Sequence, residues 1–94
     1  MNSYLVERYL PGVSEPDLRA GLDRLRDACE KLASGGSTAR YVGSIFLPQE
    51  ETCFCRVDSD SAETAVRANQ LAQLPFARIT PAVAIVPARA QPPG

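Results

Sequence analysis

Residues 14 to 36 repeat apolar side chains at steps of four and three, the spacing that places them on one face of an α-helix. Ser14 can cap the first turn, where Pro16 costs no hydrogen bond, and Gly35-Gly36 can end the last turn. The pattern therefore predicts an amphipathic helix packed on a core. Its apolar stripe consists of Leu18, Leu22, Leu25, Cys29 and Leu32.

A second, shorter helix is predicted over residues 61 to 72. Asp60 or Ser61 can cap it, and Glu63 follows Asp60 by three positions, as in a capping box. The side chains on its apolar face are small and suit close packing on a sheet. They are Ala62, Ala65, Val66, Ala68, Leu71 and Ala72.

Four segments rich in β-branched and aromatic residues predict β-strands. Pro11-Gly12 ends the first segment, and the turn sequence at 48–51 joins the second and third segments into a hairpin. Pro81, in the fourth segment, has no amide hydrogen to donate, which favours an edge position in a sheet. The four segments span residues 4–10, 39–47, 52–58 and 78–86.

The order βαββαβ predicts a ferredoxin-like α+β sandwich with both helices on one face of the sheet. We expect an antiparallel sheet in the strand order 4-1-3-2, except that its two central strands, the first and the third, are expected to run parallel. One domain is predicted over residues 1–87. Residues 88–94 are expected to form a flexible C-terminal tail, because they have no means of burying themselves.

Alternation along each strand divides the side chains between the two faces of the sheet. The face under the helices is expected to carry Val6, Ile45, Cys53, Cys55 and Val57. The other face, called the open face below, is expected to carry Leu5, Glu7, Tyr9, Val42, Ser44, Phe46, Phe54 and Arg56. This second set is too apolar for bare solvent and too polar for a closed core. It predicts a homodimer, forming an α+β barrel around a ligand cavity.

The chain has three cysteines and no histidine. The absence of histidine excludes imidazole metal sites and both Ser-His-Asp and Cys-His catalysis. Cys53 and Cys55 supply only half of a tetrahedral zinc site, and a disulfide between such neighbours is strained. We therefore expect both thiols to be reduced core residues, and we assign no metal ligand and no cofactor.

The charge is nearly balanced, with ten Lys and Arg against eleven Asp and Glu. No basic stripe is present, so a nucleic-acid partner is not expected. The N-terminus does not resemble a signal peptide, and no apolar segment approaches the ~20 residues that a membrane span needs. We expect a cytoplasmic protein with no membrane partner.

Three stretches in order, YLVERYLPG, RYVGSIFLPQEETCFC and ANQLAQLPFARI, resemble a family of small bacterial ferredoxin-like domains of unknown function that includes a nickel-binding branch. The resemblance covers about residues 3–86. It implies a ferredoxin-like fold, a homodimer joined through the open face and a metal or small ligand held there.

The resemblance also indicates which positions correspond to the ligands of the nickel-binding branch. Three histidines of that branch fall at Glu7, Asn69 and Leu74, and one cysteine matches Cys55. An arginine follows the first of these positions, here Arg8. Because nickel prefers imidazole to the oxygen ligands that Glu and Asn offer, the chain departs from the nickel-binding pattern.

Two functions remain open from the sequence. The first is a homodimeric binding protein that holds a small molecule or a metal ion on the open face. The second is a cofactor-independent isomerase or cyclase, in which Glu7 acts as general base and Tyr9 or Arg56 stabilises an enolate. We also expect a contact between Glu7 and Arg56. The candidate ligand-binding residues are Glu7, Tyr9, Ser44, Arg56 and Asn69.

Overall fold

The computed structural model describes residues 1–88 and contains four strands and two helices in the predicted βαββαβ order. The sheet order is β2-β3-β1-β4, which is the predicted order 4-1-3-2 read from the opposite edge. The ferredoxin-like α+β prediction is therefore confirmed. The elements are β1 (Asn2–Tyr9), α1 (Glu15–Ser34), β2 (Ala39–Leu47), β3 (Thr52–Ser59), α2 (Ala62–Leu71) and β4 (Arg78–Ala82).

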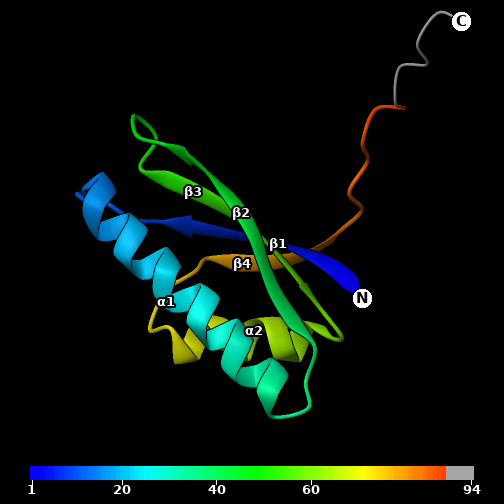
Figure 1. Ribbon diagram of the computed structural model, residues 1–94. Coiled ribbons are helices and arrows are strands. Elements are labelled where there is room, and N and C mark those ends of the chain that lie inside the picture. Colours follow the sequence, from blue (N-terminus) through cyan, green and yellow to red (C-terminus); the bar gives the residue numbers. More distant parts are fainter. Residues whose placement is uncertain (89–94) are drawn as a thin grey trace, which may run out of the picture.

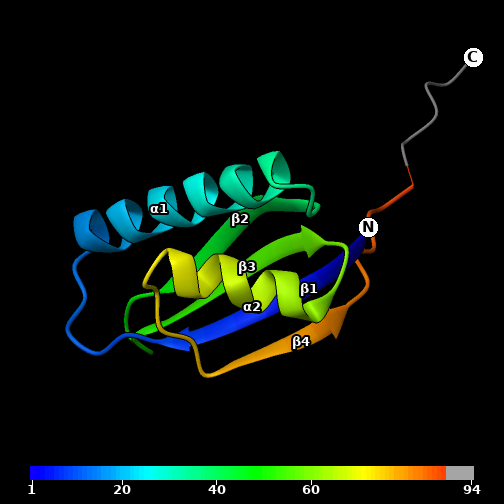
Figure 2. The same ribbon diagram turned by 90° about the horizontal axis from the view of Figure 1, so that it is seen from below.

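Both helices cover one face of the sheet and leave the other face open (Figures 1 and 2). Each helix begins at a serine, because the Ser14 side chain accepts a hydrogen bond from the Asp17 amide and the Ser61 side chain accepts one from the Thr64 amide. The core lies between the helices and the sheet, where Val6, Leu25 and other apolar side chains are fully buried. No helix of residues 1–88 is long and apolar enough to span a membrane.

The two central strands, β1 and β3, run antiparallel, so the prediction that they are parallel is wrong. The crossover through α1 makes β2 parallel to β1, and the hairpin then reverses the chain so that β3 opposes both neighbours. In this register Leu5 lies opposite Arg56, and Glu7 lies opposite Phe54. Glu7 and Arg56 are therefore diagonal neighbours and do not face each other.

A β-bulge in β2 changes the predicted face assignment of the second half of this strand. Tyr41 pairs with Val57 and Gly43 pairs with Arg56, so Val42 is an extra residue between two successive pairs. A single extra residue moves every later side chain to the opposite face. The assignments of Ser44, Phe46 and Ile45 are therefore wrong: Ser44 and Phe46 turn toward the helices, and Ile45 turns toward the open face.

β4 is an edge strand, as Pro81 predicts, but it ends at Ala82 and not at residue 86. Ala82 pairs with Ser3, next to the start of β1. Beyond this point β4 has no neighbouring strand to accept or donate ladder hydrogen bonds, so residues 83–88 form no strand. Of the predicted tail, residues 89–94 lie outside the described part of the chain.

Candidate functional site

A band of exposed apolar side chains crosses the open face of the sheet. Ile45 is 70% exposed, and Leu5, Val42 and Leu47 are each more than a third exposed. The band borders an open hollow of about 210 Å³. A contiguous apolar surface of this kind marks a contact site. The hollow is lined by Leu5, Val42, Gly43, Ser44, Ile45, Phe54 and Arg56.

Glu7 lies on the open face, but its ionic partner is Arg78 of β4. The Arg78 Nε donates to Glu7 Oε2 at 2.7 Å. The two residues are direct cross-strand partners in the β1–β4 ladder, whereas Arg56 is only a diagonal neighbour of Glu7. The predicted Glu7–Arg56 contact is therefore wrong, because the Glu7 carboxylate is bonded to the guanidinium of Arg78, its direct cross-strand neighbour.

Arg56 belongs to a second ion-pair group on the open face, centred on Asp58. The guanidinium of Arg56 donates to both carboxylate oxygens of Asp58, at 3.0 and 2.9 Å, and Arg40 donates from β2 at 3.4 Å. The hydrogen bonds from Arg56 are the main cause that lowers the pKa of the Asp58 carboxyl below its usual value. The Asp58 carboxylate is thus held ionised between two cations.

The five predicted site residues divide between the two faces of the sheet. Glu7, Tyr9 and Arg56 share the open face, where Tyr9 is 60% exposed at the end of β1. Ser44 borders the hollow, yet its hydroxyl bonds on the helix side, and Asn69 is a fully buried residue of α2. The structure therefore places three of the five on one face, brings Ser44 beside Arg56 at the hollow, and separates Asn69 from the other four.

The most unusual group under the helices is Arg8, whose side chain is fully buried. Its Nη2 donates to Asn69 Oδ1 at 2.7 Å, and its Nη1 lies 3.2 Å from the Pro75 carbonyl and 3.4 Å from the Leu74 carbonyl. Asn69 is held in turn by its own donation to the Ala65 carbonyl at 2.8 Å. All of these partners are neutral.

The Arg8 guanidinium has no carboxylate partner among residues 1–88. Its Nε is also buried without a hydrogen-bond partner. A buried charge is costly unless it is paired, so an uncompensated arginine in a core needs an explanation.

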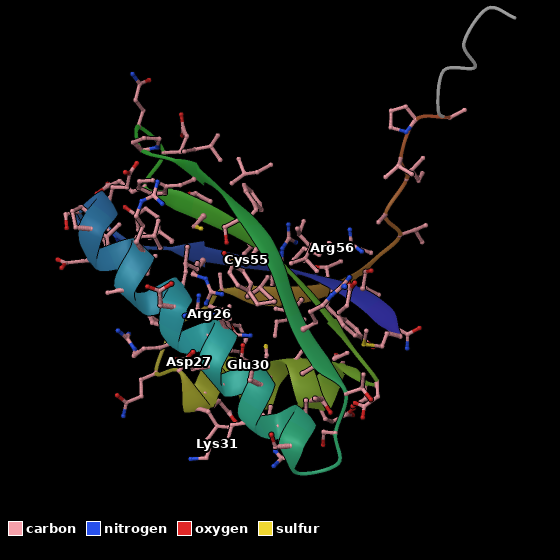
Figure 3. The ribbon with its side chains drawn as sticks, in the orientation of Figure 1. Arg26, Asp27, Glu30, Lys31, Cys55 and Arg56 are labelled. Atoms are coloured by element: carbon pink, nitrogen blue, oxygen red, sulfur yellow. The ribbon has the colours of Figure 1, made fainter. Side chains whose placement is uncertain are left out.

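Two thiols lie beside this arginine on the neighbouring strand. Cys53 is the direct cross-strand partner of Arg8, and Cys55 follows on the same face. Both cysteines are fully buried and free, as predicted, and their sulfurs are 3.7 Å apart. Figure 3 shows Cys55 on the side of β3 that faces α1, away from Arg56.

Hydrogen bonds and the nearby cation favour one thiolate in this pair. The hydrogen bond between the two sulfurs is the main cause that lowers the pKa of Cys55 and raises that of Cys53, and burial also raises the pKa of Cys53. The Arg8 charge lowers the pKa of both thiols. The Ser44 hydroxyl also donates to Cys55 Sγ, at 2.9 Å, and is itself bonded to the Tyr41 hydroxyl. These groups form a continuous polar cluster, called the Arg8 cluster below, that consists of Arg8, Tyr41, Ser44, Cys53, Cys55 and Asn69.

Arg8 is not among the residues predicted from the sequence to form a site. The signal is nevertheless present, because Arg8 has the same parity in β1 as Val6 and therefore falls on the face under the helices. The alternation of side chains along the strand is thus enough to predict that this arginine faces the core.

Asn69 is expected to contribute to stability chiefly through Arg8. Replacing Asn69 by Ala leaves the Arg8 Nη2 without its best acceptor, which should lower the free energy of unfolding by about 2 kcal/mol. Urea unfolding followed by circular dichroism measures this change. Gln70→Ala, at the exposed next position of α2, is the control and should change stability by less than ~0.5 kcal/mol. Equal losses in the two variants would contradict this role.

The Asp58 ion pairs predict a pH-dependent stability. Because folding lowers the pKa of Asp58, its contribution is present above the ordinary value of 3.8 and is lost as the pH falls below it. Asp58→Asn should therefore cost about 1 kcal/mol at pH 7. Its difference from the wild type should shrink in unfolding curves recorded at successively lower pH. Asp23→Asn, on the exposed face of α1, should have little effect at any pH.

Comparison with solved structures finds the same fold in a bacterial protein. The crystal structure of SCO4226 from Streptomyces coelicolor A3(2) superposes with a TM-score of 0.61 at 18% sequence identity, over 94% of this chain and 99% of that chain. At this identity the likeness shows the fold alone. No curated protein matches the chain.

Comparison with protein families gives a match over most of the domain. Residues 4–82 match the family described as nickel responsive protein SCO4226-like. The matched segment begins within β1 and ends at the last residue of β4, so it includes both sheet faces and both helices. The chain therefore belongs to the SCO4226-like family of nickel responsive proteins.

Proposed function

We propose that this chain is a small binding protein that pairs with a second copy through the open face and holds a small, partly apolar anion in the cavity between the two sheets. The observation that carries the proposal is the exposed apolar band around the hollow, of which Ile45 is the most exposed member. Apposing two such bands removes them from water, and each buried Å² of apolar surface contributes roughly 25 cal/mol.

The charges beside the band favour an anionic ligand. Arg40, Arg56 and Arg78 supply three guanidinium groups on this face, and Glu7 and Asp58 supply two carboxylates. A dimer duplicates this excess of positive charge inside one cavity. Arginine offers a planar fork that matches a carboxylate or phosphate group, which supports a ligand of that class.

Nickel does not fit the residues of this chain. No group of three or more Cys, Asp or Glu side chains that could hold a metal ion occurs within residues 1–88, and the chain has no histidine. The positions that match the ligands of the nickel-binding branch also do not converge. Glu7 lies on the open face, whereas Cys55, Asn69 and Leu74 are buried on the helix side. Nickel therefore has no part in the proposal.

A catalytic role for Glu7 has less support than binding. The Glu7 carboxylate is engaged by Arg78, and Glu7 is not among the residues that line the hollow. A general base must reach the proton that it removes in a plausible substrate position. We therefore do not propose the isomerase or cyclase activity.

The dimer predicts that a charge at Ile45 disrupts association. Ile45→Glu places a carboxylate at the most exposed position of the apolar band and should convert a dimer into a monomer in sedimentation equilibrium at micromolar concentration. Leu71→Glu, at a position of α2 that is 52% exposed, is the matched control and should leave the dimer intact. A monomeric wild-type protein would contradict the proposal, as would an Ile45→Glu variant that remains a dimer.

The anion site predicts that thermal stabilisation by ligands depends on Arg56. A panel of small carboxylates and phosphate esters should contain compounds that raise the melting temperature of the wild type. In Arg56→Gln the same compounds should give no shift relative to the variant without ligand, because one guanidinium of the cavity is missing. Arg19→Gln, on the exposed face of α1, should respond like the wild type. A panel that shifts neither protein would count against an anionic ligand.

A further inference from the structure

The Arg8 cluster combines two features that the proposed binding function does not use. One is a fully buried cation without a carboxylate partner among residues 1–88. The other is a pair of free, buried thiols whose sulfurs are 3.7 Å apart on the strand next to it. Each feature is costly or idle alone, and a ligand that binds the thiols with a net negative charge would use both.

A negative charge at the position of the thiols would stabilise the buried Arg8 guanidinium. Arg8 has neutral acceptors for Nη1 and Nη2, and its Nε has none. Burying an ion without a counter-charge destabilises the folded state. A thiol–thiolate pair carries one net negative charge, and a bis-thiolate complex of a monovalent metal ion carries the same charge, so such an ion can replace the shared proton and keep Arg8 balanced.

We propose that Cys53 and Cys55 bind one soft monovalent cation of the Cu(I) type as a bis-thiolate, whose single net negative charge is balanced by Arg8. Thiolates select Cu(I), Zn and Fe–S clusters, and of these Cu(I) is the monovalent ion. A divalent ion at the same place would give a neutral complex and leave Arg8 uncompensated. It would also lack ligands, since two thiols are half of a tetrahedral set.

The distance between the sulfurs permits such a complex with little movement. With metal–sulfur bonds of roughly 2.3 Å, sulfurs 3.7 Å apart subtend an angle of roughly 107° at the metal. The Ser44 hydroxyl lies 2.9 Å from Cys55 Sγ, at the edge of the thiol pair. A modest rotation of one thiol would widen the angle toward linear.

A surface pocket between α1 and β2 reaches the edge of the Arg8 cluster. Ser44, Tyr41 and Phe46 line a pocket of about 370 Å³, together with residues of the first half of α1. Ser44 is exposed there, and its hydroxyl touches Cys55 Sγ, so it separates the pocket from the thiols. A metal ion delivered to this pocket reaches Cys55 by displacing one hydroxyl–sulfur contact.

The binding step is an exchange of protons for a metal ion. The Cys53 proton, and the Cys55 proton where it is present, leave for solvent as the two sulfur–metal bonds form. The metal keeps its oxidation state, and no disulfide forms or breaks. Binding should therefore strengthen as the pH rises until both thiols are deprotonated.

Titration of the purified chain with Cu(I) tests the site. The chain, reduced and free of oxygen, competes for Cu(I) held in a bicinchoninate buffer, and the loss of the coloured chelate measures the affinity. The wild type should bind one Cu(I) per chain. Cys53→Ser and Cys55→Ser should each abolish this binding. Cys29→Ser removes the third buried thiol, on α1, and should bind like the wild type.

The same titration separates this proposal from unspecific thiol binding. A wild-type chain that takes up no Cu(I) would overturn it. So would equal losses in all three cysteine variants, or one Cu(I) per two chains. Ni(II) offered under the same conditions should not bind to the two thiols. If the wild type binds Ni(II) and Cys53→Ser does not, the assignment to a monovalent ion is overturned.

The role of the Arg8 charge in Cu(I) binding is tested by two variants that change the charge beside the thiols. Arg8→Met removes the cation, and Asn69→Asp gives it a competing carboxylate at the position of its present acceptor. Both changes should weaken Cu(I) binding 10–100-fold, the range typical of partners outside the ligand set. Circular dichroism checks the fold, and Asn69→Asp provides the test if Arg8→Met does not fold. Unchanged affinity in a folded variant would contradict the charge balance.

Discussion

The burial of the Arg8 guanidinium is the constraint on which the interior of this domain depends. It links β1 to α2 through Asn69 and to the segment after α2 through the carbonyls of Leu74 and Pro75. A hydrophobic side chain at this position would fill the volume but would leave those three acceptors without a donor. The arginine thus orients the connection between α2 and β4 while it brings a charge into the core.

The two faces of the sheet consequently carry two different kinds of chemistry. The open face pairs its charges locally, as in Glu7–Arg78 and Arg56–Asp58, and leaves apolar area exposed between them. The covered face buries its apolar side chains and holds one guanidinium that has no carboxylate partner among the described residues. Association and ligand contact are expected where apolar surface is in excess, and metal or thiol chemistry where charge is in excess.

The elements of the fold could be predicted from local patterns, whereas the site could be predicted only in part. Helical spacing and the caps at Ser14 and Ser61 determine where both helices begin, and these are short-range signals. The faces of β1 and β3 also follow from alternation, because both strands pair without interruption. In β2 alternation fails after Val42, since a bulge depends on how the strand pairs with its neighbour and has no clear local signature. The choice of ion-pair partners is likewise non-local. Glu7 contacts Arg78, which is 71 residues away in the chain, because β4 returns beside β1.

The bulge at Val42 couples the two faces through a single residue. One additional position in β2 determines which face the later side chains point to: Ser44 and Phe46 point to the helix side, and Ile45 points to the open face. Deletion of one codon there would exchange them all at once, turning Ile45 inward and withdrawing the Ser44 hydroxyl from Cys55. Within the family, a change of strand length at this point would therefore alter the association surface and the thiol environment in one evolutionary step, with no substitution at either.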